Sequence, residues 1–116
     1  GLVGSEMCIR DRDDISDAYY PYGRNNMLEV AFLASHLLWM TGASDMETLY
    51  DMITVNGARA MGIKNFGIKQ GNNANLVVLG VDSVLEALRF QDAPAYVVSH
   101  GKLIAGNSTQ TRLYKK

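Results

Sequence analysis

Residues 27–40 form a helical pattern that is apolar around almost its whole circumference, and this strongly limits the folds open to the chain. The apolar positions are Leu28, Val30, Ala31, Phe32, Leu33, Ala34, Leu37, Leu38, Trp39 and Met40, interrupted by a narrow polar stripe at Glu29 and His36. Asn25 or Asn26 is expected to cap this helix, and Gly42 to follow its end. Such a helix needs apolar neighbours on nearly every side, whereas a chain of about 100 residues buries only about 60 to 70% of its unfolded surface. The helix therefore fits best in the wall of a domain larger than this chain.

Two shorter helices are expected to follow. Ser44 and Glu47 form a capping-box pattern, in which each side chain satisfies a backbone donor of the other residue, and a helix should continue from there to about Ile53. Thr54 can then cap a third, short helix that Gly62 ends.

Beyond these helices the pattern changes to that of short strands. The expected elements are a turn-rich connection over 67–73, a buried strand over 75–79, a helix from Asp82 or Ser83 to about Phe90, and strands over 95–99 and 102–105. His100 and Gly101 form a two-residue turn between the last two strands, with glycine where a positive φ is needed. The chain is therefore predicted to be of the α/β class, with helices followed by a few strands.

An acidic and aromatic cluster precedes the first helix. Residues 13–23 hold three aspartates and three tyrosines, closed by a proline and a glycine. Carboxylates gathered in one place need a cation, a proton or a basic partner to compensate their charge. By itself, the pair Asp13–Asp14 is typical of a solvated turn or a helix cap, so a metal or proton-transfer site needs further support.

Composition excludes several classes of partner. Hydrophobic residues make up 47% of the chain, charged residues 20%, and the net charge is −1, so no basic surface for nucleic acid is expected. The apolar runs are far shorter than the roughly 18 to 20 residues that span a bilayer, so no membrane segment is expected. The expected location is cytoplasmic.

Residues 1–12 resemble a translated sequencing adapter, the mosaic-end type used in transposon-based libraries. The alternative is a natural short N-terminus. The resemblance implies that residues 1–12 are not native and that the true upstream sequence is missing. Because Cys8, the single cysteine, lies in this segment, it gives no information on disulfides or a thiol nucleophile.

From Asp13 to about Ala105 the chain resembles the C-terminal part of the bacterial cytosine deaminases, which belong to the amidohydrolase superfamily. The matching residues, in order, are Asp13-Asp14, Asp17, Tyr20-Pro21, Asn26-Met27-Leu28, Ile53-Thr54, Ala58-Arg59, Gly67-Ile68, Gly71-Asn72, Ala74-Asn75-Leu76, Ala87-Leu88-Arg89 and Gly101-Lys102. Each motif is weak alone, but the ordered series is specific. The resemblance implies the end of a metal-dependent (β/α)8 barrel over residues 13–66 and part of a small β-sandwich domain over residues 67–116.

The same resemblance implies the chemistry and its residues. Asp13 matches the aspartate that ends the eighth barrel strand, where it ligates a divalent metal, Fe or Zn, and shuttles a proton. Asp14 matches a neighbouring carboxylate at the substrate pocket, and Tyr19 stands where cytosine deaminases carry a tryptophan. The implied reaction, in pyrimidine metabolism, converts cytosine and water to uracil and ammonia. Because Tyr19 changes the pocket's shape and adds a hydroxyl, an aminotriazine or another cyclic amide or amine is an alternative substrate.

The other metal ligands of that family, a His-x-His pair and histidines from two later strands, would lie upstream of Asp13 and are absent from this chain. We therefore predict that the 116-residue chain is an inactive fragment of an active parent. His36 and His100 are interpreted as a packed helix residue and an exposed turn residue. A non-enzymatic αβ interaction module is the alternative from another class, and the oligomeric state of the parent, a homo-oligomer included, stays open.

Overall fold

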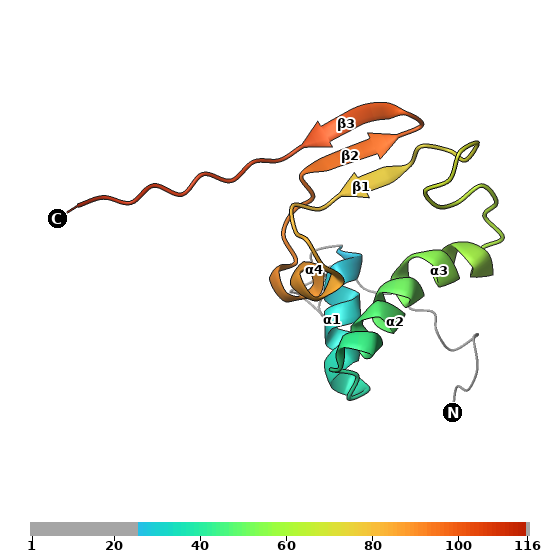
Figure 1. Ribbon diagram of the computed structural model, residues 1–116, viewed down its shortest axis with the longest axis horizontal. Coiled ribbons are helices and arrows are strands. Elements are labelled where there is room, and N and C mark those ends of the chain that lie inside the picture. Colours follow the sequence, from blue (N-terminus) through green and yellow to red (C-terminus); the bar gives the residue numbers. More distant parts are fainter. Residues whose placement is uncertain (1–25, 116) are drawn as a thin grey trace, which may run out of the picture.

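The computed structural model describes residues 26–115, which form helices and short strands (Figure 1). The elements are α1 (Met27–Leu37), α2 (Ala43–Ile53), α3 (Val55–Ala60), β1 (Leu76–Val78), α4 (Val84–Phe90), β2 (Tyr96–Ser99) and β3 (Lys102–Gly106). This is the predicted order of helices followed by strands. The adapter-like segment 1–12 and the acidic cluster 13–23 lie outside the described residues.

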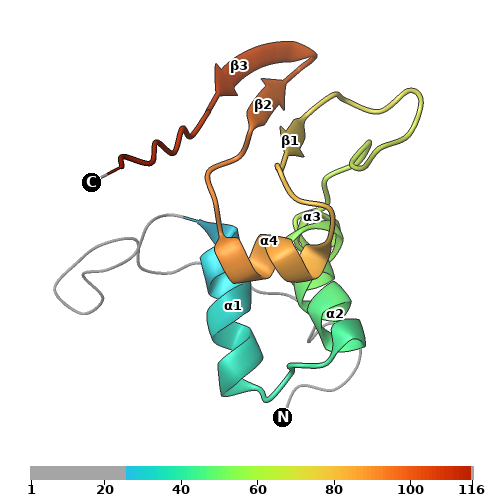
Figure 2. The same ribbon diagram turned by 60° about the vertical axis from the view of Figure 1, so that its left-hand side comes forward.

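The core of the described region lies where three helices meet. Figure 2 shows α1 and α2 side by side, with α4 lying across both, and α4 packs against each of them. The buried cluster consists of Ala31, Ala34, Leu49, Met52 and Leu88. Two of these residues are alanines, whose small side chains let the helices approach closely, and Leu49 is the largest fully buried side chain in this part of the chain. The core is therefore small.

The first helix ends earlier than its apolar pattern predicts. α1 stops at Leu37 instead of Met40 because Trp39 adopts a left-handed backbone conformation with φ of 56°. The Met40 N–H then donates to the Ser35 carbonyl at 2.9 Å, which closes the helix end in the manner of a Schellman motif. This reversal returns the Met40 side chain to the core, against which it packs.

The start of the second helix also differs from the prediction. Gly42, instead of Ser44, is the N-cap of α2, and its N–H donates to the Asp45 carboxylate at 3.0 Å. Ser44 already lies inside the helix, where its carbonyl accepts from the Thr48 hydroxyl at 3.1 Å. The predicted Ser44–Glu47 capping box is therefore wrong, because a second acidic residue two positions earlier takes the corresponding role.

The caps of α3 and α4 agree more closely with the sequence. Gly62, at φ of 68°, ends α3 as predicted, and the Ile63 N–H donates to the Ala58 carbonyl at 3.0 Å. Thr54 occupies the N-cap position of α3 but makes no side-chain cap, so that part of the prediction is wrong. Ser83 caps α4 by accepting from the Glu86 N–H at 3.2 Å.

The three strands form one antiparallel sheet in the order β1-β2-β3. His100 and Gly101 join β2 to β3 with φ of 50° and 78°, so both turn residues have positive φ, as a two-residue hairpin turn requires. A register shift between Val97 and Val98 interrupts the pairing with β3. The hairpin is anchored to β1 because the His100 N–H donates to the Asn75 side chain at 2.8 Å.

Much of the apolar surface of α1 is uncovered within the described residues. Leu33 and Leu37 of α1 are 40% and 72% exposed, and Trp39 just beyond the helix is 89% exposed, although α2 and α4 cover the side that carries the two buried alanines. This exposure is consistent with the expectation that the helix needs more apolar neighbours than the chain supplies. No helix within residues 26–115 is both long and apolar enough to cross a membrane.

Candidate functional site

The residues predicted to form the site, Asp13, Asp14 and Tyr19, lie outside the described residues. The nearest element that the structure describes is α1, whose first residue, Met27, stands four positions after the end of the acidic cluster 13–23 in the sequence.

Asn26 fixes the start of α1. Its backbone is extended, with φ of −121° and ψ of 118°, and its side-chain oxygen accepts from the Leu28 N–H at 2.9 Å. An asparagine at this position satisfies a backbone donor that would otherwise be orphaned at the first turn. This interaction confirms the second of the two predicted caps.

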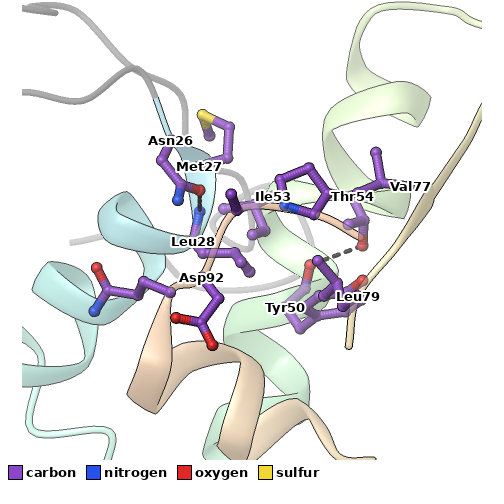
Figure 3. Close-up of a pocket in the computed structure, with 12 residues that line it drawn as sticks. Asn26, Met27, Leu28, Tyr50, Ile53, Thr54, Val77, Leu79 and Asp92 are labelled. Carbon is purple, nitrogen blue, oxygen red and sulfur yellow. Dashed lines mark hydrogen bonds between the residues drawn. The ribbon is translucent and has the colours of Figure 1, made fainter. Parts of the chain in front are cut away.

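A cavity of about 550 Å3 lies beside this helix start. Figure 3 shows its labelled residues coming from the start of α1, the end of α2, the region of β1 and, for Asp92, the connection after α4. The lining residues are Asn26, Met27, Leu28, Tyr50, Ile53, Thr54, Val77, Leu79, Gln91, Asp92, Ala93 and Pro94. The cavity thus forms where the helices meet the sheet and the connection from α4 to β2.

Two polar side chains at this cavity bond to the backbone. The Thr54 hydroxyl donates to the Tyr50 carbonyl at 2.7 Å, and both groups are drawn in Figure 3. The Gln91 side-chain amide donates to the Leu88 carbonyl at 3.1 Å. Asp92, which also lines the cavity, is exposed to solvent. Thr54 and Gln91 therefore stabilise helix ends, and most of the other lining residues are apolar.

Side chains able to ligate a metal do not cluster in the part of the chain that the structure describes. Within residues 26–115, no group of three or more His, Cys, Asp or Glu side chains could hold a metal ion. His36 is exposed, with its ring 4.6 Å from that of Phe32, so it packs on a neighbour without being buried. His100 lies in the exposed turn where it was predicted, and its ring nitrogen is 3.0 Å from the Ser99 hydroxyl.

Comparison with known proteins gives the family. The pattern that defines the amidohydrolase family matches residues 10–105, which is most of the chain. The chain belongs to the amidohydrolase family. The matched range of this amidohydrolase includes the three predicted site residues.

Individual amidohydrolases are also similar. The chain is 36% identical over 93 residues to N-isopropylammelide isopropyl amidohydrolase of Pseudomonas sp. strain ADP, a match covering 79% of this chain and 23% of the relative. The crystal structure of 5-methylcytosine deaminase from Klebsiella pneumoniae, liganded with phosphonocytosine, superposes with a TM-score of 0.80 and 33% identity. That match covers 88% of this chain and 25% of the deaminase.

A third similarity points to the same family. N-isopropylammelide isopropylaminohydrolase from Burkholderia multivorans superposes with a TM-score of 0.73 and 30% identity, covering 78% of this chain and 23% of that protein. The chain therefore spans about a quarter of the length of the relatives it matches. Its described part is a mixed arrangement of helices and strands that resembles the corresponding region of these amidohydrolases.

Sequence reasoning did not single out Tyr50, Gln91 or Asp92 at the cavity. These residues come from different elements, and no local motif joins them. Asn26, Met27 and Leu28 could be found, because they belong to the ordered series of motifs on which the resemblance to cytosine deaminases rests.

Proposed function

We propose that this chain is part of a metal-dependent amidohydrolase that removes an amino group from cytosine or a similar ring amine. In this reaction water attacks the ring carbon, the carbon–nitrogen bond to the amino group breaks, and cytosine and water become uracil and ammonia. The observation that carries the proposal is the similarity to 5-methylcytosine deaminase, which extends over 88% of this chain at a TM-score of 0.80.

The proposed architecture follows the family. Residues 13–66 would end a (β/α)8 barrel, and residues 67–116 would contribute to a small β-sandwich domain. The antiparallel order of β1, β2 and β3 supports the second assignment, because antiparallel strands are typical of sandwiches and not of the barrel itself. In a barrel enzyme the site would lie at the carboxyl ends of the barrel strands. The proposed location is cytoplasmic, and the proposed partner is a small, nucleobase-like substrate.

Asp13 is the residue proposed to transfer the proton of the attacking water. It would accept a proton from the attacking water and return it to the departing amine, which requires a carboxylate within hydrogen-bond reach of both. Asp13 is also proposed as one ligand of an Fe or Zn ion. Such an ion supplies Lewis-acid chemistry when it is bound. The described residues do not form a metal site, and one carboxylate does not hold a catalytic ion, so no step is assigned to the metal. For the same reason we propose that the 116-residue chain alone is inactive.

Asp14 and Tyr19 are proposed to contact the substrate. A tyrosine in place of the tryptophan of cytosine deaminases is smaller and brings a hydroxyl that needs a partner. This favours an aminotriazine as the second candidate substrate, and the relatives named for N-isopropylammelide support that alternative. A pocket whose polar groups hydrogen-bond one substrate ring strongly disfavours a second ring that leaves those pocket groups without partners.

The proposal can be tested in a chimera. Residues 13–116 would replace the matching quarter of the Klebsiella deaminase, and release of ammonia from cytosine and of isopropylamine from N-isopropylammelide would be measured. We expect turnover of at least one substrate, with Asp13→Asn lowering kcat by about a thousandfold, within the range of a lost general acid–base. Glu47→Gln removes the same charge at an exposed helix position and should leave kcat unchanged.

A second variant tests which residue sets the substrate preference. Tyr19→Trp in the chimera should raise the ratio of kcat/KM for cytosine to that for N-isopropylammelide, because it restores the aromatic residue expected in a cytosine pocket. A folded, metal-loaded chimera that keeps full activity after Asp13→Asn would refute the role of Asp13. Equal effects of Tyr19→Trp on both substrates would refute the role of Tyr19 in specificity.

A further inference from the structure

Asn26 fixes the point at which the chain enters the helical core. Its side-chain oxygen accepts from the Leu28 N–H at 2.9 Å, the hydrogen bond drawn between these two residues in Figure 3. Leu28 in turn packs against the buried cluster that α1, α2 and α4 share. The first turn of α1 is therefore held twice, by a cap on its backbone and by an apolar contact with the core.

One of the residues proposed to contact the substrate stands close to this turn in the sequence. Tyr19 precedes Asn26 by seven positions, and Pro21 lies between them. Seven residues span at most about 25 Å when fully extended, and a proline fixes one φ angle of the stretch. Unwinding the first turn of α1 would add about four residues to this connection. The state of the helix start therefore sets how long the connection to Tyr19 is.

Asp13 depends less on the same helix start. It stands thirteen positions before Asn26, and the proposed architecture places it at the end of a barrel strand. A strand in a closed barrel is hydrogen-bonded to neighbours on both sides, so its position is set by the barrel. Loss of the α1 cap should therefore weaken substrate binding through Tyr19 more than proton transfer by Asp13.

We propose that Asn26 is a positioning residue for substrate binding that acts through Tyr19. Its cap keeps the first turn of α1 closed, and so keeps the connection to Tyr19 short. This role rests on the proposed function, because it requires that Tyr19 contact a ring substrate. It holds for cytosine and for an aminotriazine alike.

A series of caps at position 26 tests this role in the chimera that carries residues 13–116. Serine caps a helix about as well as asparagine, glycine slightly less well, and alanine poorly. We expect Asn26→Ser to leave KM unchanged, Asn26→Gly to raise it slightly, and Asn26→Ala to raise it about fivefold, with kcat within about twofold of the parent. A KM that does not follow this order, or a kcat that falls as far as KM rises, would overturn the role of Asn26.

Ser83→Ala is the matched control. Ser83 caps α4 by accepting from the Glu86 N–H at 3.2 Å, so this variant also removes one helix cap. It should leave both KM and kcat unchanged, because α4 does not lead to a residue proposed for the site. If Ser83→Ala raises KM as much as Asn26→Ala does, the effect is a general loss of stability and the positioning role is wrong.

Hydrogen exchange tests the cap in the 116-residue chain itself. The cap hydrogen bond protects the Leu28 amide, which should exchange faster in Asn26→Ala and at the parent rate in Asn26→Ser. Unchanged exchange in Asn26→Ala would show that the first turn stays closed without the cap, which contradicts the proposal.

A binding measurement separates this role from the proposed function. Calorimetric titration of the chimera with phosphonocytosine, the ligand in the Klebsiella deaminase structure, gives a Kd that needs no turnover. If the chimera turns over cytosine but neither KM nor Kd follows the cap series, the role of Asn26 fails and the proposed function stands. If the chimera turns over neither cytosine nor N-isopropylammelide but Kd follows the cap series, the deaminase proposal fails and the role of Asn26 stands.

Discussion

Trp39 closes α1 in a conformation that few side chains adopt readily. Its φ is 56°, and 89% of its surface is exposed. Glycine is the usual residue at this position of a helix end, because a Cβ atom in the left-handed region crowds the backbone. We predict that Trp39→Gly makes the chain more stable than Trp39→Ala.

The magnitude follows from three contributions. Because only about a tenth of the indole is buried, its removal costs roughly 0.5 kcal/mol, and this loss is the same in both variants. Relief of the left-handed strain by glycine contributes about 1 to 2 kcal/mol. The greater freedom of glycine in the unfolded chain offsets about 0.4 to 1 kcal/mol of this gain. The free energy of unfolding of Trp39→Gly should therefore exceed that of Trp39→Ala by roughly 0.8 kcal/mol, the difference between the midpoints of these two ranges.

Thermal unfolding followed by far-ultraviolet circular dichroism measures the difference, which corresponds to about 4 °C in Tm for a domain of this size. Leu38 is the matched control, because its φ of −101° carries no left-handed strain. There the order should reverse, with Leu38→Ala more stable than Leu38→Gly. If the two Trp39 variants melt at the same temperature, or if both positions show the same order, the assignment of strain to Trp39 is wrong.

Further predictions concern the core, a cap and the hairpin. Leu49→Ala removes a fully buried side chain and should lower the free energy of unfolding by about 3 kcal/mol in urea titration, whereas Leu37→Ala, at a 72% exposed position, should cost less than about 1 kcal/mol. Ser83→Ala should cost about 1 kcal/mol by removing the α4 cap, while Ser44→Ala, inside α2, should stay within about 0.5 kcal/mol; a larger loss at Ser44 would restore the predicted capping box. Gly101→Ala should destabilise the β2–β3 hairpin by about 1 kcal/mol through its φ of 78° alone, since nothing lies within 4 Å of the added Cβ, and hydrogen exchange of the Val97 and Ala105 amides should report it.

The fold was predictable where a local signal had a single interpretation. His100 and Gly101 specify a tight turn and Gly62 specifies a helix end, and both are confirmed. The start of α4 was predicted at Asp82 or Ser83, and the structure selects Ser83. The predictions failed where two signals competed. The patterns that begin at Gly42 and at Ser44 both end in an acidic residue three positions later, and local sequence does not choose between them. Which of the two becomes the N-cap of α2 depends on where the five residues 38–42, which connect α1 to α2, let the second helix begin.

The candidate site was predictable only through resemblance. Asp13, Asp14 and Tyr19 stand in an ordered series of motifs, and the amidohydrolase match includes them, but their roles remain proposals. The cavity beside Asn26 had two signals in the sequence, the helix cap and the motifs Asn26-Met27-Leu28 and Ile53-Thr54 of the ordered series. Its other polar residues are brought together only when α2 and the connection after α4 pack near the helix start.

The sequence by itself determined the order of helices and strands, the tight hairpin turn, and a first helix too apolar for a chain of this size. These follow from side-chain chemistry repeated at fixed spacing, which acts within a few residues. Tertiary structure decided that α1 ends at Leu37, that Trp39 takes a left-handed conformation, and that apolar grooves open between helices and sheet. Packing decides these because Met40 reaches the core only if the backbone reverses before it, and because a groove depends on surfaces far apart in sequence.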